Sequence, residues 1–361
     1  MKIPLTKVYF DNNEEKAIID VLRSGWVLQG PKVEKFEKSV KAYVGSKYAV
    51  AVSSGTTALY LSLKILGVGK DDEVILPSFT FIACANVVVQ VGAVPVFADI
   101  DPLTFNIDPK DIEKKITKKT KAIMVVDQVG LPADLDEVNK ICKKHKLFFL
   151  EDAACALGSI YKGKRVGSIA DITCFSFHPR KNLTTGEGGM ITTNNQKWTE
   201  RVKVLRNHGI DSNGNYQVIG YNFRMTDIQA SVGMVQLKKI NWLIKKRGVL
   251  SQRYSKAFKN INTLKLPYVP SDRKTNWQSY LLKLREGIDR EKLILKFKKR
   301  GVALKEGIPS IHLQPIYQKL VGKIKLSETE KASSQTLFLP LYPQMTIKEQ
   351  DYVIDLLIKS L

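Results

Sequence analysis

The chain has 361 residues, of which 44% are hydrophobic and 25% charged, as in an ordinary soluble globular protein. This length predicts one large and one smaller domain. No run approaches the ~20 apolar residues of a membrane-spanning helix, and the first residues lack the apolar block and cleavage site of a signal peptide. Four cysteines without a CxxC pair predict no disulfide framework. We therefore expect a cytoplasmic enzyme or binding protein, without a metal site.

The net charge is +22, from 57 Lys and Arg against 35 Asp and Glu. Such an excess is typical of nucleic-acid binding. The lysines, however, are spread in short runs at 114–121, 143–146 and 238–247, and no aromatic-interleaved patch or nucleic-acid module accompanies them. We therefore favour a solvated lysine-rich surface that helps to attract an anionic substrate, with neither a nucleic-acid nor a membrane partner.

Apolar runs alternate with helical patterns from about residue 48 onward. Strands are predicted at 48–54, 72–78, 93–101 and 121–130, each followed by a helical segment. Repeated βα units predict an α/β domain with a mostly parallel sheet. A long helix starting near Met225 is expected to carry the chain out of this domain. The pattern then changes to that of a small α+β domain, so we divide the chain into residues 1–245 and 246–361.

Ligands of open α/β sheets bind beyond the carboxyl ends of the strands, so residues that follow apolar runs are candidates for a binding site. The segment "SSGTTAL" at 53–59 ends a strand, turns at Gly55 and opens a helix at Thr56. The free N–H groups and the positive end of the helix dipole predict a phosphate site there. A plain Ser/Thr helix cap explains the same residues.

The segment "FFLEDAACALG" places Asp152 directly after an apolar strand. An acid at this point often binds a cofactor or a metal, and the alternative role is to cap a following helix. Further along, Lys181 follows the apolar run "ITCFSF", which contains Ser176. A desolvated lysine can lose its charge and form a Schiff base with a carbonyl, although a lysine can also extend to solvent.

Phe79 and Phe81 follow the strand "EVIL", where an aromatic ring either covers a flat cofactor or packs in the core. Together the four places require one ligand with a phosphate, a flat ring, a basic ring nitrogen and an aldehyde. Pyridoxal 5′-phosphate (PLP) has all four features. A carboxylate beside the ring nitrogen keeps it protonated, which makes the ring an electron sink.

These motifs also resemble those of a known family, the DegT/StrS sugar aminotransferases, and of its perosamine-synthase-like members in particular. The resemblance extends in order over essentially the whole chain through "RSGWVLQGPKVEKFE", "AVSSGTTAL", "DEVILPSFTFIACANVVVQVGAVPVFADID", "GLPADLD", "EDAACALG", "FSFHPRKNLTTGEGGMITTN", "RNHG", "GYNFRMTDIQASVGMVQL", "HLQPIY" and "LPLYPQMT". It implies the aspartate-aminotransferase-like (fold type I) architecture. It also implies a homodimer with active sites at the subunit interface.

The resemblance assigns a role to individual residues. Lys181 would form the Schiff base with PLP and move the proton, and Asp152 would pair with the ring nitrogen. Phe81 would stack on the ring, and Asn222 would reach the phosphate bound by the neighbouring subunit. The remaining phosphate contacts would come from Gly55, Thr56 and Ser176.

Trp26, Arg224 and His312 are the candidates for the substrate region. One position departs from the more familiar pattern. After "EDAA", many members carry His, Gln or Glu near the 3′-oxygen of the cofactor, whereas this chain has Cys155. A thiol is a weak hydrogen-bond donor, so this contact is expected to be missing or replaced by water.

The implied reaction transfers an amino group, with glutamate as the expected donor, to a keto-deoxysugar linked to a nucleotide diphosphate. Amination at C4 is favoured over C3, and the product would enter amino-sugar or surface-polysaccharide biosynthesis. Two alternatives share the fold: a PLP-dependent sugar dehydratase and a non-catalytic regulatory protein. Dehydratases of this type carry His in place of the lysine, so Lys181 favours transamination.

Overall fold

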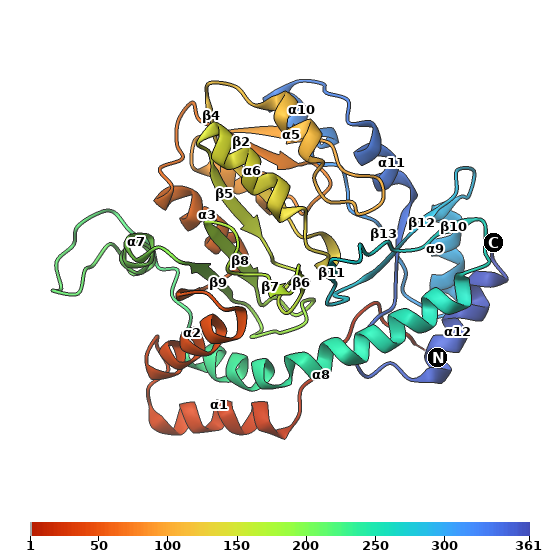
Figure 1. The fold of residues 1–361 in the computed structure, drawn as a ribbon. Coiled ribbons are helices and arrows are strands. Elements are labelled where there is room, and N and C mark those ends of the chain that lie inside the picture. The colour runs from red at the N-terminus through yellow and green to blue at the C-terminus, as the bar shows by residue number, and fades with distance from the viewer. Residues whose placement is uncertain (1) are drawn as a thin grey trace.

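The computed structural model describes residues 2–361, and a seven-stranded mixed sheet forms its larger part (Figure 1). The strands are apolar because helices cover both faces of the sheet. β9 is antiparallel to its two neighbours, and the other pairs are parallel. This confirms the predicted mixed, mostly parallel sheet. In spatial order the strands are β1 (Tyr48–Val52), β9 (Gly189–Thr193), β8 (Ile172–Ser176), β5 (Phe148–Asp152), β4 (Thr120–Val126), β2 (Glu73–Pro77) and β3 (Val94–Ala98).

Helices pack on both faces of this sheet. One face is covered by α3 (Gly55–Ile65), α4 (Ala83–Gln90) and α7 (Gln196–Arg206), whose apolar residues join one core with the strands. The opposite face is covered by α2 (Pro31–Val44), α5 (Pro109–Lys115), α6 (Leu135–His145) and the first half of α8 (Asp227–Phe258). α1 (Asn12–Ser24) packs on α8. The short 3₁₀ helix η1 (Gln128–Gly130) follows β4.

The long helix α8 belongs to two cores. It begins after Thr226, whose hydroxyl accepts a hydrogen bond from the Gln229 N–H in a capping box. Its first half contributes Leu237 to the core of the large sheet, whereas its second half contributes Tyr254 to the core of the smaller sheet. The expected helix from near Met225 is therefore present, and it links the two sheets as expected. The domain boundary at 245/246 falls inside α8, so that division stays a prediction.

The C-terminal part forms a four-stranded antiparallel sheet covered by helices. Its strands are, in spatial order, β10 (Leu264–Lys265), β12 (Tyr280–Leu284), β14 (Thr336–Leu339) and β13 (Lys305–Glu306). The helices are α9 (Arg290–Lys299), η2 (Ile311–Leu313), α10 (Pro315–Val321), α11 (Ser327–Gln335) and α12 (Ile347–Ile358). A small third sheet joins β11 (Arg273–Lys274), β6 (Ile160–Tyr161) and β7 (Lys164–Arg165). No helix within residues 2–361 is long and apolar enough to cross a bilayer.

Candidate active site

A large cavity lies at the carboxyl ends of the parallel strands, facing the smaller sheet. Its volume is about 560 Å³, within the range of small-molecule sites. Residues that follow β1, β2, β5 and β8 line it, together with Lys305, Ile308 and Phe338 from the C-terminal part. The sequence-predicted residues that it brings together are Gly55, Thr56, Phe81, Asp152, Cys155, Ser176 and Lys181.

Asp152 ends β5 and is held in place by two donors. Its Oδ1 accepts a hydrogen bond from the Ala154 N–H at 3.0 Å, and its Oδ2 accepts one from the Cys84 thiol at 3.0 Å. The chain then turns toward β6, so Asp152 caps no helix. Burial raises the pKa of Asp152, while the Cys84 and Ala154 hydrogen bonds act in the opposite direction. A nearby cation, such as a protonated ring nitrogen, would favour the ionised carboxylate.

Lys181 lies in the turn after β8, and its side chain lines the cavity instead of extending into open solvent. Its Nζ donates a hydrogen bond to the Cys155 sulfur at 3.2 Å. Burial alone lowers the pKa of Lys181, but Cys155 and Asp152 act in the opposite direction, and the net pKa lies above the ordinary lysine value. The loss of charge expected of a desolvated lysine is therefore offset by the groups around it. In the ligand-free protein, Lys181 must lose a proton before it can attack a carbonyl.

The N-terminus of α3 faces the same cavity. Ser54 and Thr57 form its capping box, so the plain capping role is present. The first N–H groups of a helix nevertheless have no intrahelical acceptor, and they are the groups that bind phosphate. Gly55 lets the start of α3 lie close to Ser176, because a Cβ at this position would lie 2.7 Å from the Cβ of Ser176. These residues fit the phosphate of PLP.

We expect Gly55→Ala to weaken PLP binding roughly tenfold to a hundredfold, because overpacking costs about 1–3 kcal/mol. The added methyl group would push against Ser176 in the phosphate cradle. Titration of the apoprotein with PLP, followed by absorbance, measures the effect. Gly69→Ala is the matched control, since the nearest atom to its Cβ is 4.0 Å away. Equal affinities of the two variants would contradict the phosphate role.

The two phenylalanines after β2 have different environments. Phe79 is fully buried and packs on Phe105 with 5.7 Å between ring centroids. Phe81 is 73% exposed and lines the cavity. Core packing therefore explains Phe79, whereas the ring of Phe81 is free to stack on a flat ligand.

Four predicted residues do not line the cavity of a single chain. Trp26 is 58% exposed between α1 and α2. Asn222 forms a bridge with Asn207, and Arg224 Nη1 donates a hydrogen bond to Asn207 Oδ1 at 2.8 Å. His312 is fully buried, with Nδ1 2.7 Å from the Ser78 hydroxyl. Its Nε2 lies 3.4 Å from Glu330 Oε1, and burial lowers the pKa of His312 while Glu330 acts in the opposite direction.

Several lining residues were not found from the sequence. Gln128 lines the cavity, and its side-chain amide donates a hydrogen bond to the Phe79 carbonyl. Cys84 touches Asp152, although the sequence marks it only as an unpaired cysteine. Arg180 and Lys305 add positive charge to the cavity wall. No local motif indicated Lys305 or Gln128, because only the packing of distant segments brings them here.

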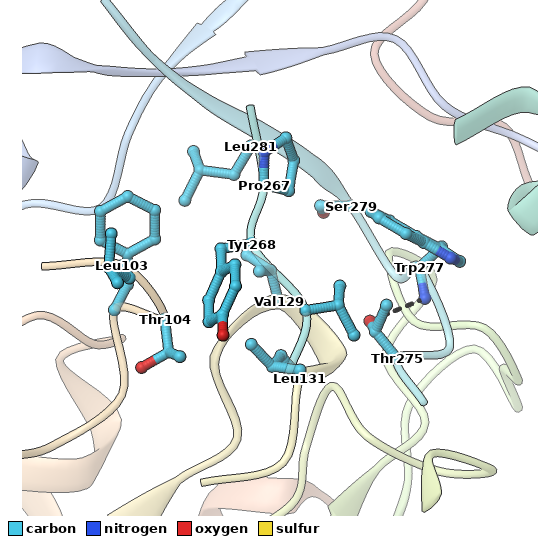
Figure 2. Close-up of a pocket in the computed structure, with 12 residues that line it drawn as sticks. Leu103, Thr104, Val129, Leu131, Pro267, Tyr268, Thr275, Trp277, Ser279 and Leu281 are labelled. Carbon is cyan, nitrogen blue, oxygen red and sulfur yellow. Dashed lines mark hydrogen bonds between the residues drawn. The ribbon is translucent and has the colours of Figure 1, made fainter. Parts of the chain in front are cut away.

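A second, much smaller cavity lies beside the first (Figure 2). Tyr268, Trp277 and Leu281 from the C-terminal part face Leu131 from the large sheet, and Val129 lines both cavities. Its volume of about 20 Å³ has room for about one water molecule. It is therefore a packing gap at the junction of the two sheets, and the large cavity is the candidate active site.

The fold and the large cavity are those of an α/β protein that binds a ligand at the strand ends. Residues 8–358 match the model of the DegT/DnrJ/EryC1/StrS aminotransferase family, and the chain belongs to this family. It is 40% identical to the spore coat polysaccharide biosynthesis protein SpsC of Bacillus subtilis, over 98% of this chain and 95% of that protein. It is 36% identical to the GDP-perosamine synthase of Caulobacter vibrioides, over 98% of this chain and 96% of that protein.

A solved structure is also very similar. Spr1654 from Streptococcus pneumoniae, in its PLP-form, aligns with a TM-score of 0.94 at 31% identity and covers 100% of both chains. The recognised resemblance to sugar aminotransferases is thus confirmed, and so is the expected α/β fold.

Proposed function

We propose that this protein is a PLP-dependent aminotransferase that moves an amino group from glutamate to the keto group of a nucleotide-linked deoxysugar. C4 is the favoured position. The observation that carries the proposal is the presence of Lys181, Asp152 and the N-terminus of α3 in one cavity. The GDP-perosamine synthase relative supports a nucleotide-linked sugar, and SpsC supports a role in polysaccharide biosynthesis.

The residues present can hold PLP by its different parts. Gly55, Thr56 and Ser176 would bind the phosphate, and Phe81 would stack on the ring. Asp152 would face the ring nitrogen, and Cys155 would lie beside Lys181 near the reactive end. When bound, PLP supplies the delocalisation that stabilises negative charge on a substrate carbon.

The protein's own groups would carry the proton. Lys181 Nζ would remove the proton from the α-carbon of the amino donor. In the second half-reaction it would return a proton to the sugar carbon that receives the amino group. Such positioned acid–base groups typically contribute about 10²- to 10⁴-fold in rate. Asp152 would remain ionised throughout and stabilise the protonated ring nitrogen.

The cavity wall also fits an anionic substrate. Arg180 and Lys305 both line it. Burial, followed by repulsion from Arg180, lowers the pKa of Lys305, while the charge of Glu306 acts in the opposite direction. A diphosphate would pair with these cations. This supports a nucleotide diphosphate sugar, while the nucleotide itself stays open.

We also propose a homodimer with shared active sites. Large apolar side chains are exposed around the loop between α1 and α2 and in the loop after α7, namely Leu22, Trp26, Leu28, Tyr216 and Ile219. Exposed apolar groups of this size are typical of interfaces. Asn222 follows the second of these loops, which supports its predicted contact with the phosphate bound by a partner subunit. Light scattering that gives the mass of one chain would contradict this proposal.

The absorption spectrum of the purified protein tests the proposed function. We expect a visible band after PLP is added, and the loss of that band when glutamate is added. The converted protein is then offered a panel of keto-sugar nucleotides, and the true substrate restores the band. If no band forms with PLP, the cavity does not bind this cofactor. If the band forms but glutamate leaves it unchanged, glutamate is not the amino donor.

A further inference from the structure

Two acidic side chains are buried at the ends of β4 and β5, behind the candidate active site. Asp127 and Glu151 are both 0% exposed. Glu151 is paired with Val125 in the strand register, and Asp127 follows Val125 by two residues. Since residues two apart in a strand project from the same face, Asp127 and Glu151 share one face. Asp152 projects from the other face, into the cavity.

Each of the two carboxyl groups has one satisfied oxygen and one without a donor. Asp127 Oδ1 accepts a hydrogen bond from the Ala133 N–H at 2.9 Å, and Glu151 Oε2 accepts one from the Thr173 hydroxyl at 2.6 Å. Within residues 2–361, Asp127 Oδ2 and Glu151 Oε1 are buried, and neither accepts a hydrogen bond from a donor group. The strand register nevertheless places both side chains on the same face of neighbouring strands, and each carboxyl group shifts the pKa of the other.

No lysine, arginine or histidine within residues 2–361 forms an ion pair or hydrogen bond with either group. Two ionised carboxylates in contact would therefore carry two uncompensated charges in the protein interior, which is a costly arrangement. One proton between the two free oxygens removes one charge and satisfies both atoms.

We propose that Asp127 and Glu151 share one proton between Oδ2 and Oε1, so that the pair carries a single negative charge and ties the end of β4 to β5. Such pairs hold one proton more strongly than isolated acids do. The inference does not depend on which substrate the protein uses.

The raised pKa values of both acids agree with a shared proton. Burial raises the pKa of Glu151 to about 7, and burial together with the charge of Glu151 raises the pKa of Asp127 well above its usual range. The other titratable groups whose charge reaches Glu151, or that Glu151 influences, are Asp152 on β5 and Cys174 on β8, both on the opposite face of the sheet. Burial raises the pKa of the Cys174 thiol, which stays neutral. The charge of Asp152 favours retention of the shared proton.

The pair positions one wall of the active site. The Asp127 N–H donates a hydrogen bond to the Asp152 carbonyl at 3.1 Å. The next two residues, Gln128 and Val129, line the cavity. Val129 has φ +49°, a conformation that a β-branched residue rarely adopts without support from its surroundings. The shared proton keeps the charge behind Asp152 at one unit, so Asp152 can stay ionised.

The proposal makes stability depend on pH in a defined direction. In the unfolded chain, both acids have ordinary pKa values and lose their protons near pH 4 to 5. Between there and about pH 7, the folded pair holds at least one proton that the unfolded state has lost. The folding equilibrium constant should therefore fall at least about tenfold per pH unit through this window. The stabilisation of the folded state by the shared proton is complete below the pKa of the acids in the unfolded chain. It is lost as the pH rises through the pKa of the folded pair.

Chemical unfolding of the wild-type protein and of Glu151→Gln from pH 5 to pH 8 tests the proposal. The introduced amide can donate to Asp127 Oδ2 and still accept from Thr173. We expect the variant to lose the tenfold fall per pH unit and to be at least as stable as the wild type at pH 8. Glu37→Gln is the matched control. Glu37 is also buried, but it pairs with Arg206 at 2.6 Å, so this variant should be less stable at every pH and keep the wild-type pH slope.

Infrared spectroscopy of the folded proteins gives a second readout that does not depend on unfolding. The wild type at pH 6 should show the carbonyl stretch of a protonated carboxylic acid, and Glu151→Gln should lack it. The proposal is overturned if the wild type shows no such band. It is also overturned if Glu151→Gln keeps the wild-type pH slope and is as destabilised as Glu37→Gln.

Discussion

Lys181→Ala is expected to reduce steady-state transamination by about 10⁴-fold or more, at the upper end of what a positioned acid–base group contributes. Lys181 lines the candidate active site, and its Nζ donates a hydrogen bond to Cys155. The charge of Asp152 contributes to the raised pKa of Lys181. In the proposed mechanism, removal of Lys181 takes away both the nucleophile for the PLP aldehyde and the proton carrier. The proposed phosphate site at α3 is unchanged in this variant, so PLP should still bind.

Two measurements on Lys181→Ala separate these effects. Steady-state turnover reports the chemical role, and equilibrium dialysis with PLP reports binding. Lys164→Ala is the control, because Lys164 is an exposed lysine of the short strand β7, and this variant should keep full activity. Turnover of the Lys181 variant within tenfold of the wild type would remove the role proposed for this residue.

Asp152→Asn is expected to slow the half-reaction with glutamate by roughly 10²- to 10⁴-fold. The amide has the same shape as the carboxylate, and its oxygen can still accept the hydrogen bond from the Ala154 N–H. Its NH2 group then faces the Cys84 sulfur, which is a weak acceptor. The negative charge is lost, however, and nothing then favours the protonated ring nitrogen. We expect the fold and much of the PLP affinity to remain.

Single-turnover absorbance with excess glutamate measures the rate for Asp152→Asn. Asp355→Asn is the control, because Asp355 is exposed on α12. A rate that matches this control would show that Asp152 supports the structure but not the reaction. A thermal unfolding curve of each variant excludes loss of fold as the cause.

The sequence was informative where a motif is local. The lysine after β8, the acid after β5 and the glycine at the start of α3 could each be recognised from the few residues around them. Each stands at the end of an apolar run, where parallel strands bring their ends to one edge of a sheet. Their meeting in one cavity was predicted for that reason, and the structure brings them together.

The roles of Trp26, Arg224 and His312 in the substrate region stay predictions. His312 could not be distinguished from a ligand-binding histidine by sequence, but it is buried against Ser78, 234 residues away in the chain. Trp26 and Asn222 lie away from the cavity of one chain, and their predicted roles require a second subunit. Lys305 and Gln128 reach the cavity through contacts between distant segments, which no local motif indicates.

The buried acids illustrate the same limit. The sequence shows Glu151 and Asp152 side by side, and alternation along a strand places them on opposite faces. It does not show that Asp127 lies next to Glu151, because that depends on the register between β4 and β5. Nor does it show that no lysine, arginine or histidine of residues 2–361 pairs with them.

By itself, the sequence determined the α/β class, the family resemblance and the identity of the residues expected to carry the chemistry. These depend on short-range patterns: apolar strands, turn glycines and the side chains that follow them. The tertiary structure decided which of those residues share a cavity, which side chains surround Lys181 and Asp152, and how their charges are balanced. Electrostatic balance in a protein interior depends on neighbours that are distant in sequence, so only the packed fold could determine it.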